Sequence, residues 1–375
     1  MLLNKTLCRK VLVLTFSLSG FVLLKAQQDF DLELQSNGGG EYNVFRSSGL
    51  SSGKEPDVES GKLRHGYFQS FNYSSRYKLK LNDHQLSLSA YSFFKFFPAV
   101  KEARQFRPRA GILYRYIAGE KIRFYVSAQF KSYNNIRIDE QEDEQFRQSS
   151  FRKYSMYFKK SLELNASMDM QVLIKYARNN FTSSSNTEQH YDSKAAELRI
   201  YQTLYDTRKY QHKIKLELEY EDRRYYLREL TEADRHRIYR SLGMFYYIKR
   251  KKRYQIDLGL QLEERSALNT SRFSYRQVRA VAKYELKKKK IQYNFSSSFS
   301  YRDYSKLIVD KSLNESLHLY SLNNSIDIEY SLKKDLKLLL EARYVFRKRN
   351  SKDAPSFLLP YTNARISIGF RFDIF

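Results

Sequence analysis

The last sixteen residues, 360–375, carry the pattern that most constrains how this chain can fold. Every second residue from Ile366 onward is apolar, and the residues between are charged or small. The apolar positions are Ile366, Ile368, Phe370, Phe372 and Ile374, and Arg365, Ser367, Gly369, Arg371 and Asp373 alternate with them. A period of two places alternate side chains on opposite faces, so the segment predicts a strand with one apolar and one polar face.

The same alternation recurs from about residue 65 to the end of the chain. The plainest example sets Ile214, Leu216, Leu218 and Tyr220 against Lys213, Lys215, Glu217 and Glu219. No apolar run of helix length lies beyond the first 26 residues, so any insertion into a membrane would be made by strands.

The connections between these segments alternate in length. Short turns are predicted near 82–85, 118–121, 162–166, 205–210, 249–253, 286–290 and 333–335. Long polar loops are predicted near 47–64, 98–108, 135–148, 182–192, 227–236, 265–272, 303–316 and 349–359. Seven turns and eight loops require sixteen strands, with both ends of the chain on the turn side. Strands of about 9–11 residues with their connections fit the available length.

The N-terminal segment has the features of a secretory signal peptide. Basic residues precede an apolar run of about fourteen residues, and Lys25 and Ala26 follow it. We predict cleavage after Ala26, which would remove Cys8, the only cysteine of the chain. Residues 27–64 are then expected to hold a first strand, somewhere in 29–46, followed by a Gly/Ser-rich loop, and residues 65–375 to form the barrel.

The terminal strand, the export signal and the even strand number together resemble a Gram-negative outer-membrane β-barrel protein of the porin-like kind. The resemblance implies a single all-β domain, an antiparallel transmembrane barrel of about sixteen strands with short periplasmic turns and long extracellular loops. It also implies a C-terminal signal read by the barrel-assembly machinery, here Phe370, Phe372 and Phe375. Phe375 departs from the pattern, because its parity is that of Arg371 and Asp373. Gln27 and the Tyr- and Lys-rich strands look like a Bacteroidetes-type protein.

A soluble β-sandwich or β-helix is the structural alternative, because half-buried sheets also alternate. Fifteen hairpins are more than one sandwich core needs, and a sandwich gives no reason for short and long connections to alternate. The barrel is therefore the favoured prediction.

The chain is strongly basic. Without residues 1–26 it has 63 Lys and Arg against 41 Asp and Glu, a balance of +22. An exported protein does not meet nucleic acid, so outer-membrane lipid and small anionic solutes are the expected partners. Basic turns at 249–253 and 287–290 would lie at the inner leaflet, where each cation near anionic headgroups contributes about 1 kcal/mol.

No catalytic, cofactor-binding or metal-binding set is predicted. The six histidines form no ligand pair at close spacing, and no phosphate-binding loop, dinucleotide fingerprint or calcium loop is present. The sequence therefore predicts a protein that is not an enzyme.

Charged residues on the polar strand faces are the pore-lining candidates. They are Arg76, Lys78, Lys80, Arg109, Arg115, Arg123, Lys131, Glu217, Glu219, Asp257 and Glu263. Cross-strand ion pairs that only keep the wall soluble are the alternative to an anion-favouring pore. If the basic and acidic groups share one depth, they would create a transverse field.

Two functions remain open at this stage. The first is a passive porin-like channel with a weak preference for anions, since a sixteen-strand barrel leaves an aqueous channel unless it is plugged. The second is a non-conducting accessory barrel that serves secretion or surface assembly. The oligomeric state stays open.

Overall fold

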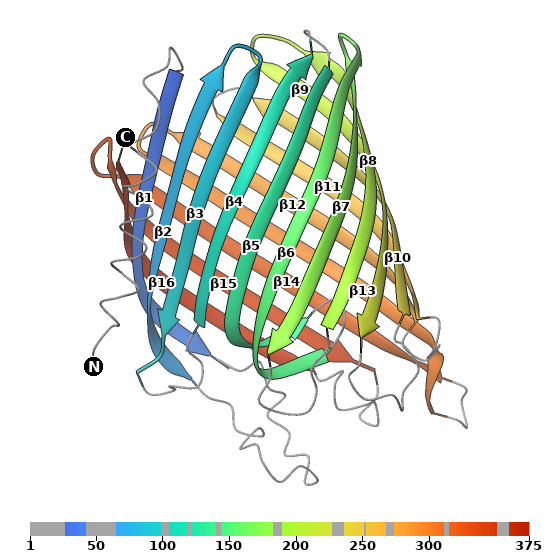
Figure 1. Ribbon diagram of the computed structural model, residues 1–375. Coiled ribbons are helices and arrows are strands. Elements are labelled where there is room, and N and C mark those ends of the chain that lie inside the picture. Colours follow the sequence, from blue (N-terminus) through green and yellow to red (C-terminus); the bar gives the residue numbers. More distant parts are fainter. Residues whose placement is uncertain are drawn as a thin grey trace.

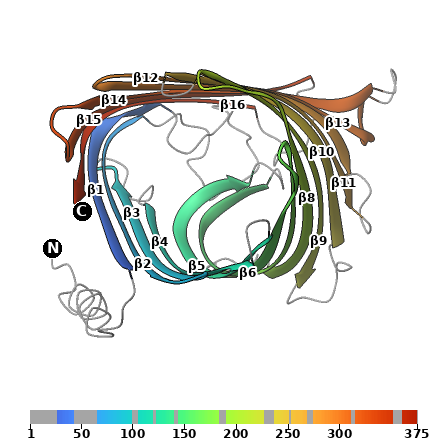
Figure 2. The ribbon, with the colours of Figure 1, turned by 90° about the horizontal axis from the view of Figure 1, so that it is seen from above.

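The chain forms one closed, tilted β-barrel (Figures 1 and 2). The computed structural model describes residues 27–42, 65–98, 105–118, 122–139, 144–182, 190–226, 236–250, 253–267, 274–310, 315–350 and 360–374. The strands are β1 Gln27–Tyr42, β2 Gly66–Leu81, β3 His84–Phe96, β4 Gln105–Ala118, β5 Ile122–Asp139, β6 Glu144–Asn165, β7 Met168–Thr182, β8 His190–Asp206, β9 Tyr210–Tyr226, β10 His236–Arg250, β11 Tyr254–Ala267, β12 Tyr275–Lys288, β13 Ile291–Asp310, β14 Glu315–Ser331, β15 Leu336–Arg349 and β16 Tyr361–Ile374. Each strand pairs antiparallel with the next, and β1 pairs with β16.

The strand faces separate sharply by polarity. The terminal strand shows this: Ile366, Ile368, Phe370 and Phe372 are exposed on the outside, whereas Asn363 and Ser367 are buried on the inside. A closed barrel satisfies its backbone hydrogen bonds without an edge, and an exposed apolar exterior suits hydrocarbon. The fold is therefore that of a transmembrane barrel. Among the described residues, no helix is long and apolar enough to span a membrane.

Sixteen strands and the alternation of short and long connections are as the sequence predicts. The turns between β2 and β3 and between β12 and β13 are two residues long, and both ends of the strand order lie at the turn end. In outer-membrane barrels this end faces the periplasm, and the longer loops face outward. The predicted signal peptide, residues 1–26, and Phe375 lie outside the described residues.

Two predicted loops are largely strand, and these predictions were wrong in extent. β5 and β6 continue to Asp139 and from Glu144, within the loop predicted near 135–148, and β13 and β14 leave only residues 311–314 of the loop predicted near 303–316. β1 runs through the glycine-rich segment to Tyr42, inside the range in which a first strand was expected. The strands are accordingly longer than predicted, from 13 residues in β3 to 22 in β6. The apolar alternation ends where a strand leaves the membrane, but its backbone ladder continues into water, so the pattern marks only the membrane part.

The barrel is not circular in section. Figure 2 shows a ring with a long flat side formed by β12 to β16, and the far end of the β5–β6 hairpin curves inward across the opening at the loop end. Figure 1 shows the same hairpin bending beneath the barrel. β4 and β11 lie on opposite sides of the ring (Figure 2).

We expect arginine to be tolerated on one face and not on the other. Phe299 is 47% exposed on the outside of β13, and Ser298, the preceding residue, has the opposite parity and faces the lumen. Phe299→Arg should destabilise the barrel by about 2–4 kcal/mol, the value for arginine near the bilayer midplane. Ser298→Arg should change stability far less. Urea unfolding of both variants in lipid vesicles measures the difference, and equal losses would contradict the assignment of faces.

Candidate functional site in the barrel lumen

All eleven pore-lining candidates fall on lumenal register positions. Arg76, Lys78 and Lys80 share the face of buried Ser70 on β2, and Arg109 and Arg115 lie opposite Tyr91 and Gln85 of β3. Arg123 and Lys131 of β5 pair with Ile117 and Arg109. Glu217, Glu219, Asp257 and Glu263 share the parity of buried Arg223 and Arg265 on β9 and β11. Their role in conduction stays a prediction.

The lumenal face of β2–β6 is a basic wall. Its basic positions are Arg76, Lys78, Lys80, Lys95, Arg107, Arg109, Arg115, Arg123, Lys131, Lys153 and Lys159. Lys131 and Lys153 are direct cross-strand partners near the loop end of β5 and β6. Between this pair and the turn end, Glu163 is the one acidic residue at the described lumenal positions of β2–β6. The neighbouring β1 places Asp29, Asp31, Glu33 and Glu41 on the same face, where Asp31 contacts Lys78 at 3.0 Å and Glu41 forms an ion pair with Lys95. The wall still holds more cations than these carboxylates, so it keeps a local excess of positive charge.

Aromatic rings hold several of these cations in place. The Arg109 guanidinium lies 5.1 Å from the centre of the Tyr91 ring, and that of Arg107 lies 5.2 Å from the Phe93 ring. Tyr125 lies between Arg115, at 5.7 Å, and the Lys159 amine, at 4.3 Å. Attraction between a cation and a ring face restrains the side chain without cancelling its charge.

The carboxylates of β8 and β9 are arranged differently, because they lie among basic neighbours. Arg199 contacts Glu197 and also Glu217, at 3.7 Å from the latter, and Lys215 forms an ion pair with Glu217. Arg223 binds Glu221 through two contacts of 2.9 and 3.0 Å. Ion pairing of this kind, the alternative considered from the sequence, describes Glu197, Glu217 and Glu221, whereas Glu219 is the direct cross-strand partner of Glu197.

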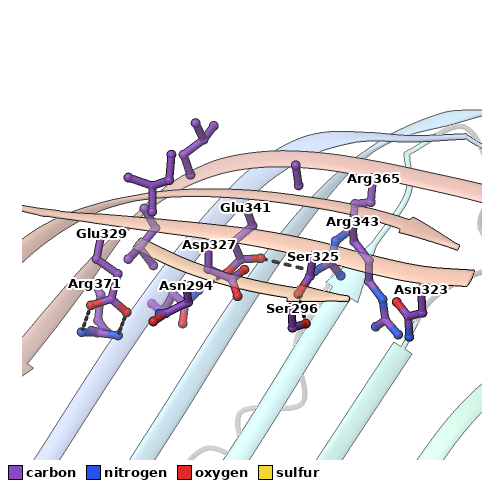
Figure 3. A pocket seen from close by; sticks show the side chains of 15 residues that line it. Asn294, Ser296, Asn323, Ser325, Asp327, Glu329, Glu341, Arg343, Arg365 and Arg371 are labelled. Atoms are coloured by element: carbon purple, nitrogen blue, oxygen red, sulfur yellow. Dashed lines mark hydrogen bonds and ion pairs between the residues drawn. The ribbon is translucent and has the colours of Figure 1, made fainter. Parts of the chain in front are cut away.

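A polar cavity of about 460 Å³ lies against the lumenal side of β13–β16 and β1 (Figure 3). Arg371 of β16 donates two hydrogen bonds of 2.8 Å to Glu329 of β14, across the intervening β15. Glu341 of β15 accepts from Arg365 and Ser367 of β16 and from Gln35 and Asn37 of β1, each at 3.3 Å. Glu341 of β15 thus contacts both strands of the β1–β16 pair.

Sequence reasoning missed a second group, which we call the arginine–tyrosine layer. It lies in the loop-end half of β8–β16 and consists of Arg223, Arg237, Arg265, Arg302 and Arg347 with Tyr191, Tyr239, Tyr275, Tyr304 and Tyr361, all nearly buried. Arg265 is 1% exposed and lies 4.4 Å from the Tyr275 ring. The sequence does show that these arginines and tyrosines have lumenal parity near the loop ends of their strands. Recognising that they form one layer required the register between strands.

Comparison with solved structures identifies the fold. The chain is similar to OccAB3 of Acinetobacter baumannii, with a TM-score of 0.53, 9% identity, and coverage of 92% of this chain and 100% of that one. It is also similar to OccD3 (OpdP) of Pseudomonas aeruginosa, with a TM-score of 0.50, 7% identity and 92% coverage of both chains. The fold is that of an outer-membrane porin. No protein-family model matches the chain, and no curated protein matches it.

We expect Glu341 to stabilise the closed barrel. Glu341→Ala removes four hydrogen bonds, two of them to β1, and should lower the free energy of unfolding by about 1–3 kcal/mol. Asp327→Ala removes the same charge from the same cavity without touching these contacts, so it serves as the control. Urea unfolding in vesicles measures both, and a larger loss for Asp327→Ala would contradict this role.

Proposed function

We propose that the protein is a passive, non-enzymatic channel for small solutes, with a weak preference for anions. The observation that carries the proposal is the basic wall of β2–β6, whose lumenal positions hold many cations and few carboxylates. Charge on the wall of a water-filled passage with low-dielectric surroundings raises the local concentration of counter-ions. Small anionic solutes are therefore the expected cargo.

The relative position of basic and acidic groups favours a transverse field. Arg109 lies nine residues before the turn end of β4 at Ala118, and Glu263 lies nine residues after the turn end of β11 at Tyr254. These two strands lie on opposite sides of the ring (Figure 2). A field across the passage orients dipolar solutes, while the excess of cations favours anions.

The arginine–tyrosine layer favours the second candidate, a non-conducting accessory barrel. Its side chains fill space along β8–β16 at the loop end, so any passage there would run beside the basic wall. Measurable conductance distinguishes the two functions. The Bacteroidetes-type origin and the signal peptide with cleavage after Ala26 remain part of the proposal. β1 begins at Gln27, the first residue after that site.

Replacing lumenal arginines should weaken the anion preference. In planar bilayers with a salt gradient, the wild-type reversal potential should indicate anion selectivity that fades at 1 M salt, where screening shortens to about 3 Å. The variant R109Q/R115Q should shift the reversal potential toward zero.

The control variant R178Q/R224Q removes two arginines from the outer face and should leave the reversal potential unchanged. Cation selectivity of the wild type, or equal shifts in both variants, would contradict the anion preference. Absence of conductance from folded, heat-modifiable protein would favour the accessory barrel.

A further inference from the structure

One continuous row of aliphatic side chains crosses the outer face of six strands. Each residue is the direct cross-strand partner of the next, and the order is Val172 of β7, Leu198 of β8, Leu218 of β9, Leu242 of β10, Leu262 of β11 and Val278 of β12. These residues line an external groove of about 860 Å³. With strands about 4.8 Å apart, the row is about 24 Å wide.

Charged side chains begin in the very next row toward the loop end. Arg240, Glu264 and Arg276 are direct cross-strand neighbours there, and all three line the groove. Glu264 lies between the two guanidiniums, with contacts of 3.6 Å to each. Asp303 of β13, the direct cross-strand partner of Arg276, lines the groove as well. Two guanidiniums thus stand beside two carboxylates at the edge of the apolar surface, and the exposure of each group decides what the cluster presents.

The two guanidiniums are the outermost part of this cluster. The Arg240 side chain is 59% exposed and that of Arg276 is 82% exposed, against 40% for Glu264 and 31% for Asp303. Farther toward the loop end, Arg178 and Arg224 are also more exposed than the Asp192 and Asp222 carboxylates that they contact. The outer face therefore presents guanidinium groups where the apolar band ends.

We propose that this groove binds a phosphorylated, multiply acylated glycolipid of the outer leaflet, of the lipid A class. The acyl chains would lie along the aliphatic row, and Arg240 and Arg276 would bind a headgroup phosphate. A guanidinium offers paired donors that match phosphate geometry, which makes arginine suited to this task. A row spanning six strands is wide enough for several chains side by side, which favours a multiply acylated lipid over a two-chain phospholipid.

The position of the arginine cluster along the strands also favours a lipid of the outer leaflet. The cluster lies on the loop side of the apolar band, where the outer-leaflet headgroups are expected. The basic turn residues Lys288 and Lys290 lie at the opposite end of the strands and would meet inner-leaflet headgroups instead. They provide a matched control, because they are exposed cations of the same chain outside the groove.

Native mass spectrometry of the folded protein with bis-phosphorylated lipid A tests the proposal. R240Q/R276Q should bind lipid A about tenfold more weakly or worse, which corresponds to the loss of one strong charge-assisted contact. K288Q/K290Q should bind as the wild type does. Glu264→Gln should bind more tightly, because it removes the carboxylate that contacts both arginines, and a folding defect cannot imitate that gain.

Two other lipids test whether the phosphates and the number of acyl chains determine binding. Dephosphorylated lipid A and phosphatidylglycerol should each bind more weakly than bis-phosphorylated lipid A, and their binding should depend less on Arg240 and Arg276. Equal binding of either lipid would overturn the proposal. An unchanged affinity in R240Q/R276Q, or an equal loss in K288Q/K290Q, would overturn it as well.

Discussion

Pairing of the first strand with the last is the constraint on which the rest of this structure depends. In hydrocarbon an unpaired strand edge leaves backbone donors and acceptors without water, so a spanning sheet must close. The β1–β16 ladder runs from Leu32 opposite Ile374 to Tyr42 opposite Ala364. It is tight at two glycines: a Cβ on Gly39 would lie 2.0 Å from the Ile366 carbonyl oxygen, and one on Gly369 would lie 2.1 Å from that of Ser36. Side chains larger than hydrogen would force the two strands apart.

Closure of the barrel determines which side chains face the lumen. The charged side chains on different parts of the lumenal wall then have different kinds of neighbour. Glu197, Glu217 and Glu221 pair with basic neighbours, and Glu341 and Glu329 bind arginines of β16. In β2–β6, Lys78 and Lys95 pair with carboxylates of β1, whereas Arg107, Arg109 and Arg115 lie against aromatic rings. Hydrogen-bonded charge pairs neutralise a wall, whereas ring contacts leave its charge in place. This difference is the physical basis for the proposed selectivity.

Much of the fold could be predicted from the sequence because alternate residues of a membrane barrel face lipid and the lumen, and the two environments require apolar and polar side chains. Ile366 to Ile374 and Ile214 to Tyr220 show that alternation, and parity alone placed Arg76, Arg115 and Glu217 on lumenal positions. The glycines of β1 could not be assigned to a strand, since they have no side chain to alternate and their role is a contact with a strand more than 300 residues away. The arginine–tyrosine layer and the external groove were missed because both depend on cross-strand register, which a single sequence does not contain.

Disulfide formation across the strand closure tests the central claim most directly. Leu34 and Phe372 are direct cross-strand partners, whereas the partner of Ile368 is Gly38, four residues further along β1. Cysteines at Leu34 and Phe372 should therefore cross-link on oxidation of the folded protein in membranes, and cysteines at Leu34 and Ile368 should not. Protease cleavage between β1 and β16 followed by a non-reducing gel measures the link. Cross-linking of the second pair in place of the first would contradict this register, and linkage of neither pair would contradict closure between β1 and β16.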